Sequence, residues 1–180
     1  SDHVGTPRRE GLWFVENALT GTGVRGHVQL AASGKVLSAF DMAVTMAIGA
    51  DWCNSARGFM FALGCLQSQH CHTNHCPVGI ATQDPARQRA LVVPQKAARV
   101  ASFHHHTVNA LAEIVAAAGL SGPTELTPAH VQRRVSPTLT QSLAECYEWL
   151  EPGQLRDGGA AGEWVQDWAA ARADRFAGPH

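Results

Sequence analysis

Two short apolar segments, residues 28–32 and 50–53, constrain the fold of this chain most. Each is followed by a loop of small residues and then by a segment with helical spacing, and a helical pattern also precedes each of them. Strands that alternate with helices through short links pair in parallel, as they do in α/β folds. Small residues after a buried strand are typical of the strand ends that hold a phosphate in (β/α)8 barrels. The sequence therefore predicts two parallel strand–helix units.

The spacing of apolar residues predicts several helices around these strands. Ser38 or Asp41 is expected to cap one of them, which ends at Gly49. A last amphipathic segment carries Trp164 and Trp168 four residues apart. The other expected helices span residues 10–19, 59–69, 94–118, 129–134 and 137–150.

The length of the chain limits how much of a barrel it can hold. A barrel of eight strand–helix units needs roughly 200 residues or more, whereas this chain has 180 residues and offers two such units before a helical tail. We expect the C-terminal portion of a (β/α)8 TIM barrel followed by a helical tail. The last barrel units and a cysteine-rich loop would occupy residues 1–90, and a helical C-terminal extension residues 91–180.

Three of the five cysteines, Cys65, Cys71 and Cys76, lie within twelve residues in a Cys-x5-Cys-x4-Cys pattern. An odd cysteine count with three close together argues against a secreted disulfide framework and for metal ligation in a reducing compartment. Three thiolates favour a three-iron cluster, since each iron takes its own protein ligand. Two alternatives stay open: zinc held by the three cysteines with His72 or His75, and three cysteines buried as small apolar residues.

The loops after the two expected strands carry candidate anion-binding residues. Their small side chains let backbone N–H groups approach an oxygen closely, and a basic side chain in each loop can add charge. One such loop would be ordinary turn chemistry, but two on successive strands match the phosphate sites of barrels, which use the last two strands. The candidates are Ser33, Gly34 and Lys35 in the first loop and Asn54, Ser55, Ala56 and Arg57 in the second.

Other features exclude functions rather than suggest them. A net charge of -1 gives no field for nucleic acid or an anionic membrane, and no apolar run is long enough to span a bilayer. Residues 21–26 match G-x-G-x-x-G, but the match follows a helix and precedes a strand, the reverse of a dinucleotide-binding motif. The run His104-His105-His106 lies mid-helix and points three ways, so it cannot chelate one ion.

The residues around the cysteines resemble those of one known family, the FMN-binding synthase domain of glutamate synthase. The likeness is strongest to the short FMN-binding glutamate synthase-like proteins that lack the amidotransferase domain. It is dense over the first 110 or so residues and looser beyond them. The motifs that carry it are Gly49-Ala50-Asp51, Asn54-Ser55-Ala56-Arg57-Gly58, Ala62-Leu63-Gly64-Cys65, Cys71, Asn74, Cys76-Pro77-Val78-Gly79 and Ala81-Thr82-Gln83-Asp84.

This resemblance implies a (β/α)8 barrel that holds FMN beside a [3Fe-4S] cluster, with Cys65, Cys71 and Cys76 as cluster ligands and the two Gly/Ser loops around the FMN phosphate. The implied reaction is the reductive amination of 2-oxoglutarate to glutamate in the cytoplasm, with ammonia or ammonia derived from glutamine. The cluster would relay electrons to the flavin from ferredoxin or from a pyridine-nucleotide reductase subunit. The strands that carry the flavin ring and the 2-oxoglutarate site would lie upstream, so no catalytic residue is assigned and this piece alone should be inactive.

Two other functions stay open at this point. One is a zinc-stabilised Cys3His interaction module with no redox role. The other is an FMN-barrel oxidoreductase that acts on a different substrate.

Overall fold

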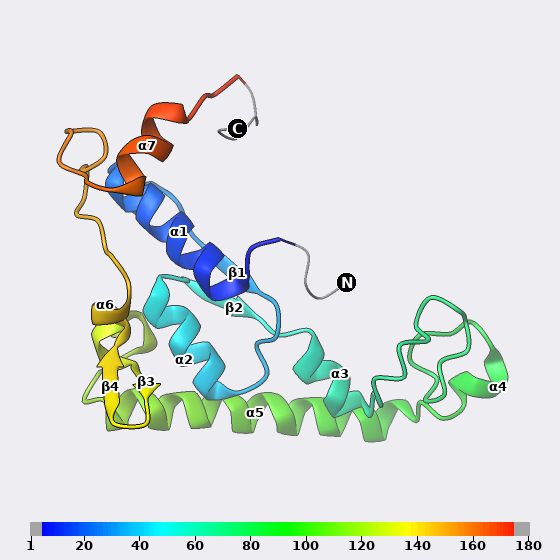
Figure 1. Ribbon diagram of the computed structural model, residues 1–180. Helices are drawn as coiled ribbons and strands as arrows, with labels where there is room; N and C mark the ends of the chain where they lie inside the picture. Colours follow the sequence, from blue (N-terminus) through cyan, green and yellow to red (C-terminus); the bar gives the residue numbers. More distant parts are fainter. Residues whose placement is uncertain (1–4, 175–180) are drawn as a thin grey trace. The chain divides into compact units, whose positions relative to one another are not determined.

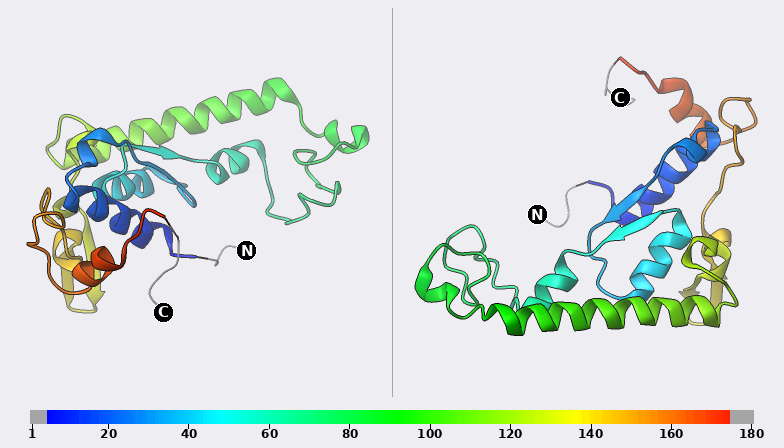
Figure 2. Two further views of the ribbon diagram at one scale, coloured as in Figure 1. Left: turned by 90° about the horizontal axis from the view of Figure 1, so that it is seen from above. Right: turned by 180° about the vertical axis from the view of Figure 1, so that it is seen from behind.

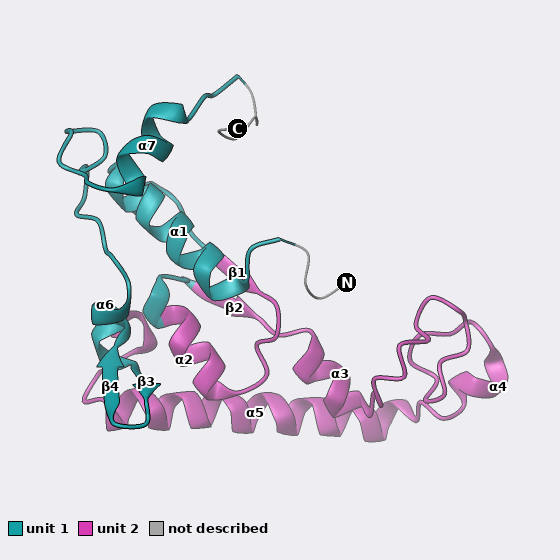
Figure 3. Ribbon diagram, in the orientation of Figure 1, with its two compact units in different colours: residues 1–30, 47–51, 127–180 teal, residues 31–46, 52–126 magenta. Residues whose placement is uncertain are grey.

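The computed structural model describes residues 5–174, which divide into two compact units. Unit 1 comprises residues 5–30, 47–51 and 127–174 of the described chain, and unit 2 comprises residues 31–46 and 52–126 (Figure 3). None of the helices in these residues is both long and apolar enough to cross a bilayer.

Unit 2 contains a parallel pair of strands, β1 (Ala31–Ser33) and β2 (Trp52–Asn54), which confirms the predicted parallel pairing (Figure 1). Both strands begin later than the apolar segments suggested. Before β1, the Arg25 guanidinium donates to the Val28 carbonyl and the Leu30 N–H donates to the Asp51 carboxylate, while the Leu30 carbonyl accepts the backbone N–H of Asp51 at 2.8 Å. The apolar segments therefore locate the two strands, and both strands begin after this backbone bond.

Helix α2 (Ala39–Ile48) follows β1 and is capped as predicted. The Asp41 carboxylate accepts bonds from the N–H groups of Leu37 at 3.3 Å and Ser38 at 3.1 Å, and the Asp41 N–H donates to the Ser38 hydroxyl at 3.1 Å. The helix ends before Gly49, whose φ of 131° lies in the region that favours glycine. Its buried apolar residues are Ala39, Ala43, Val44, Ala47 and Ile48.

Helix α3 (Arg57–Leu63) is shorter than the predicted helix over residues 59–69, so that prediction was wrong at its C-terminal end. Gly64 ends the helix in a left-handed conformation (φ 100°), and its N–H donates to the Phe61 carbonyl at 2.9 Å. A glycine in this conformation closes a helix whatever the apolar spacing that follows it. The residues after it form a long loop that runs to the short helix α4 (Pro85–Gln88).

Helix α5 (Val93–Ala117) confirms the predicted helix over residues 94–118 and is the longest element of unit 2 (Figures 1 and 2). Pro94 occupies its first turn, where the missing N–H needs no partner. The helix packs against α3, and the rings of Phe59 and Phe103 pack edge to face with their centroids 5.3 Å apart. A short 3₁₀ turn, η2 (Pro123–Glu125), follows it.

Unit 1 is built on helix α1 (Arg8–Gly21), which confirms the predicted helix over residues 10–19. Gly23 follows the helix with a φ of 76°, and the 3₁₀ turn η1 (Arg25–His27) comes next. The G-x-G-x-x-G match is therefore a helix end and a link, as predicted. The C-terminal helix α7 (Glu163–Ala170) belongs to the same unit and buries Trp164 with Leu150 and Leu155.

Arg25 ties three parts of unit 1 together. Its guanidinium pairs with Glu16 on α1 at 2.5 Å and with Asp51 at 3.1 Å, and it donates to the carbonyls of Val28 and Gly49 at 2.7 Å each. Burial disfavours the charged form, but the bond to Glu16 and the charges of both carboxylates outweigh it and raise the pKa of Arg25 above its usual value.

Two helices predicted in the C-terminal region were wrong, because the chain forms a hairpin there. The 3₁₀ turn η3 (Pro128–His130) precedes strand β3 (Gln132–Ser136), which pairs antiparallel with β4 (Leu139–Ser142). Pro137 lies at the turn and disfavours helical backbone in the residue before it. A helix does begin at the end of β4, but α6 (Leu143–Cys146) has only four residues.

Candidate functional site

The two candidate anion-binding loops start side by side. In the parallel register Ser33 lies opposite Asn54, so the loops leave the same edge of the β1–β2 pair. The Ser55 hydroxyl donates to the Val36 carbonyl at 2.7 Å and joins the second loop to the first. The structure therefore brings together the two groups of residues that the sequence singled out.

The first loop turns sharply and stays open to solvent. Gly34 and Lys35 have φ values of 109° and 55°, and Ser33, Gly34 and Lys35 are all exposed. The N–H groups of Leu37 and Ser38 are already bonded to Asp41 and are not available to an anion. An anion bound here would therefore contact the turn itself, with the Lys35 ammonium group to balance its charge.

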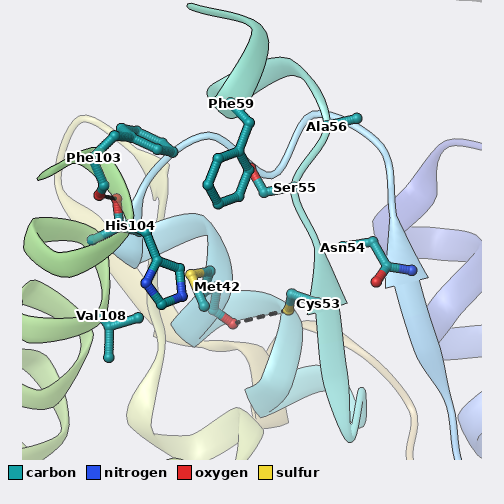
Figure 4. Close-up of a pocket in the computed structure, with 10 residues that line it drawn as sticks. Met42, Cys53, Asn54, Ser55, Ala56, Phe59, Phe103, His104 and Val108 are labelled. Carbon is teal, nitrogen blue, oxygen red and sulfur yellow. Dashed lines mark hydrogen bonds between the residues drawn. The ribbon is translucent and has the colours of Figure 1, made fainter. Parts of the chain in front are cut away.

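The second loop has two faces, because successive side chains of β2 point to opposite sides. Figure 4 shows Asn54 turned away from the side chains of Met42, Phe59 and His104, whereas the Cys53 thiol faces Met42. The Cys53 sulfur lies 4.0 Å from the Met42 carbonyl oxygen, so this thiol packs against helix α2.

A cavity of about 450 Å3 lies on the Cys53 side of β2, within unit 2. Its wall is mostly apolar, and the rings of Phe59 and Phe103 contribute to it together with His104 (Figure 4). Residues 54–56 line the cavity, but the amide of Asn54 points elsewhere. The cavity therefore borders the second loop at Ser55 and Ala56, whereas Ser33, Gly34 and Lys35 of the first loop are not among its lining residues.

The cysteine loop follows α3 and is held in an unusual backbone conformation. Gln67, Gln69 and Asn74 have φ values of 54°, 59° and 64°, which non-glycine residues seldom adopt. The Asn74 side-chain oxygen accepts from the Gln83 N–H at 2.6 Å and from the Thr82 hydroxyl at 3.1 Å. The Thr82 hydroxyl, itself buried, lies 2.6 Å from the Asn74 carbonyl oxygen. Asn74 and Thr82 thus fix the chain on either side of Cys76.

The three thiols differ in their surroundings. Cys76 is buried, Cys65 is half-buried and Cys71 is exposed, and all three are free of disulfides. The N–H of Ala81, assisted by those of residues 78–80, lowers the pKa of the Cys76 thiol and outweighs the opposing effect of burial. The Cys65 sulfur accepts the N–H of Gln67 at 3.4 Å. N–H donors of this kind stabilise a thiolate and the negative charge that it keeps as a ligand.

A site for one metal ion and a polynuclear cluster place different demands on the positions of their ligands. Among the residues that the structure describes, no three or more His, Cys, Asp or Glu side chains meet where one ion could hold them. His72 and His75, the candidate fourth ligands for zinc, are both exposed. A polynuclear cluster does not need its ligands to meet at one ion, since each thiolate binds a different iron. Three soft thiols on one loop, two of which accept backbone N–H bonds, have the donor chemistry that such a cluster requires.

Sequence reasoning identified the cysteines that would bind a cluster but missed the residues that hold the cysteine loop in its conformation. Asn74 and the segment 81–84 appear among the motifs that carry the family resemblance, but nothing in their spacing shows that Asn74 bonds to Thr82 and Gln83. A polar residue with a left-handed preference between two cysteines was the available signal. The His104-His105-His106 run is exposed on α5, and the ring of His104 stacks on that of Phe59.

In a comparison with protein families, residues 1–121 match the conserved region in glutamate synthase. The chain is 41% identical over 134 residues to the glutamate synthase large subunit-like protein YerD of Bacillus subtilis, which covers 74% of this chain and 26% of that protein. It is 33% identical over 120 residues to the archaeal glutamate synthase (NADPH) of Methanocaldococcus jannaschii, and the matched region covers 67% of this chain and 24% of that protein. It is 38% identical over 81 residues to the chloroplastic ferredoxin-dependent glutamate synthase 2 of Arabidopsis thaliana, which covers 45% and 5%. The chain therefore spans about a quarter of the length of the first two relatives.

Proposed function

The chain belongs to the glutamate synthase family, and on this premise we propose that it forms part of an FMN- and [3Fe-4S]-dependent oxidoreductase. The proposed reaction is the reductive amination of 2-oxoglutarate to glutamate with ammonia, in the reducing conditions of the cytoplasm. The observation that carries the proposal is the position of the cysteine loop. It follows directly after a helix that starts at the exposed ends of two paired parallel strands.

In this proposal β1 with α2 and β2 with α3 are the last strand–helix units of a (β/α)8 barrel. Parallel strands are buried by helices on their faces, and ligands bind at their carboxyl ends. Ser33, Gly34 and Lys35 would hold the FMN phosphate together with the second loop, Asn54, Ser55, Ala56 and Arg57. The parallel register supports this assignment, because it starts both loops at one edge.

The residues of this chain would bind and position the cofactors. When bound, FMN and the cluster supply hydride and single-electron chemistry that no side chain can provide. The open turn at Gly34 and Lys35 offers N–H groups and a positive charge to a phosphate dianion. Cys65, Cys71 and Cys76 would bind the irons as thiolates, and the N–H groups of residues 78–81 would stabilise the charge on the buried sulfur. Asn74 and Thr82 would keep the loop in the conformation that presents these thiolates.

Cysteine variants test the ligand assignment. Anaerobic reconstitution of the chain with iron and sulfide should give a brown protein, and Cys71→Ser should lower its iron and sulfide content far more than Cys146→Ser. Cys146 is the matched control, because it lies half-buried in α6 of unit 1 and outside the cysteine loop. Equal loss of iron in the two variants would refute the assignment. A colourless protein that keeps one zinc would instead support the interaction module.

A separate assay tests the substrate. A protein that contains this chain together with the rest of the barrel should form glutamate from 2-oxoglutarate, ammonia and a reduced donor. Flavin reduction without glutamate would favour an FMN-barrel oxidoreductase with a different substrate. The donor itself is proposed by analogy with the ferredoxin and the pyridine nucleotide that the names of the relatives mention.

A further inference from the structure

The cavity beside Cys53 plays no part in the proposed reaction. All of its lining residues belong to unit 2, and it lies where helix α5 passes over β2 and α3 (Figure 4). Helix α5 closes on α3 at Gly58, where an added β-carbon would lie 2.8 Å from the Phe103 ring. Within the described residues it makes few close backbone approaches to α2. A space of about 450 Å3 therefore remains in front of Met42 and Cys53.

The cavity has the size and the access of a small-molecule site. Such sites have volumes of roughly 300–1,000 Å3 and walls that are mostly apolar. His104 and Val108 line the cavity from α5, and both are exposed, Val108 to 43%. The cavity therefore opens to solvent along this side of α5.

The walls of the cavity favour a flat and neutral ligand. The ring of His104 lies over that of Phe59, with an angle of 27° between the planes, and the Phe103 ring meets Phe59 edge to face (Figure 4). Aromatic walls of this kind bind a further ring by stacking or by edge contacts, and the thioether of Met42 can adapt to its shape. None of the described residues that line the cavity is Lys, Arg, Asp or Glu. Because burial of an unpaired ion is costly, these walls disfavour an anion such as a phosphate.

Two hydroxyl groups in the wall select the polar group that a ligand should carry. The Ser55 hydroxyl donates to the Val36 carbonyl, and the Thr107 hydroxyl donates to the Phe103 carbonyl, each at 2.7 Å. Both side chains are half-buried. A hydroxyl whose hydrogen is already used can only accept a further bond. A ligand that matches this wall therefore brings an N–H or O–H donor.

We propose that this cavity is a binding site for a small neutral aromatic molecule that carries one N–H or O–H donor. The site neither requires nor uses the cofactors of the proposed function, so the two proposals can fail independently. Ser55 and Ala56 of the second loop border the cavity, and for this reason FMN is included in the test as a competitor.

A matched pair of probes tests the ligand class. Indole has one N–H donor, and 1-benzofuran has nearly the same shape without a donor. In calorimetry with the purified chain, indole should bind at one site, about three- to tenfold more tightly than 1-benzofuran, which is the net effect of one hydrogen bond. Thr107→Val or Ser55→Ala should remove this preference, and binding of 1-benzofuran should stay unchanged. If neither variant reduces the preference, the assigned donor contact is wrong.

A matched pair of variants tests the location. Val108→Trp adds a ring at the opening of the cavity and should lose most of the indole binding. Asn109→Trp adds the same ring at the next residue of α5, which is exposed and not among the lining residues, and it should bind indole like the unaltered chain. Circular dichroism shows whether each variant folds. Equal indole binding by the two variants would overturn the proposal.

Cysteine labelling gives a readout that needs no substitution. Saturating indole should slow alkylation of Cys53 by N-ethylmaleimide, measured by mass spectrometry of the peptides, and should leave Cys146 unaffected. Both thiols are half-buried, but Cys146 lies in unit 1. Equal slowing of both would contradict the site. Displacement of indole by FMN would assign the cavity to the flavin, and binding that is lost in a protein containing the whole barrel would show that another segment covers it; either result would overturn the proposal.

Discussion

The substitution Asn17→Ala tests how unit 1 is held together. Asn17 is 1% exposed on helix α1, and its side chain bonds to three backbone groups. Its oxygen accepts from the Leu150 N–H at 2.7 Å, and its nitrogen donates to the carbonyls of Glu148 at 3.1 Å and Trp13 at 3.2 Å. The buried amide of Asn17 therefore links residues 148–150 to helix α1 through hydrogen bonds.

The expected loss follows from the partners that would be left. In Asn17→Ala the buried Leu150 N–H has no acceptor from this side chain, which costs about 1–3 kcal/mol. The Glu148 carbonyl keeps its bond from the Trp13 indole at 2.8 Å and loses less. The small cavity adds about 1 kcal/mol. We expect the free energy of unfolding of unit 1 to fall by about 2–4 kcal/mol.

Tryptophan fluorescence during urea unfolding measures this loss, because Trp13, Trp149, Trp164 and Trp168 all lie in unit 1 and only Trp52 lies in unit 2. Asn109→Ala is the matched control, since Asn109 is exposed on α5 of unit 2. The control should change the free energy of unfolding by less than about 0.5 kcal/mol. An Asn17→Ala variant as stable as the control would refute the role assigned to Asn17.

Asn17→Asp gives the same test a pH dependence. The carboxylate could still accept from Leu150, but it would face the carbonyl oxygens of Glu148 and Trp13 in a buried site. Both burial and these dipoles would raise the pKa of the new carboxyl group above its unfolded value. The destabilisation should therefore be complete above the folded pKa and should be relieved as the pH falls toward the unfolded value of about 3.9.

Two further predictions concern unit 1. Arg25→Lys should lower the free energy of unfolding, measured by urea titration, by about 1–3 kcal/mol. An ammonium group cannot replace the planar guanidinium group, which binds two carboxylates and two carbonyls. Unchanged stability of this variant would show that these bonds are dispensable. Ser142→Ala should cost about 1 kcal/mol in thermal unfolding by removing the cap of α6. The bonds from Ser142 lower the pKa of Glu145, so their stabilisation is present above the unfolded pKa and is lost as the pH falls through the folded one. Stability of the variant should accordingly depend less on pH between about 3 and 5, and an unaltered pH profile would count against the capping box.

The sequence predicted the elements whose signals are local. Apolar spacing located α1 and α5, capping residues located the start of α2, and the order of strands and helices predicted a parallel β1–β2 pair. The helix signals depend on residues within a few positions of one another, and the parallel pair follows from the order of neighbouring elements. The parallel order of the strands also predicts that the two candidate loops leave one edge of the pair, and the register confirms it.

The features that were missed depend on partners that lie elsewhere or on backbone choices that spacing does not show. The helix expected through residue 69 ends at Gly64, because a left-handed glycine cap overrides the apolar spacing. The C-terminal hairpin forms because residues 132–136 find partners in residues 139–142, and helical periodicity does not report pairing. Asn17 looks like an ordinary helix residue until its partners at positions 148 and 150 are known.

The most direct test of the account is electron paramagnetic resonance of the anaerobically reconstituted and then oxidised chain. If Cys65, Cys71 and Cys76 bind one three-iron cluster, the oxidised protein should show the signal of one unpaired spin per chain, with about three irons per chain by chemical analysis. A protein without a signal that contains one zinc, or iron that stays bound after all three cysteines are changed to Ser, would contradict it.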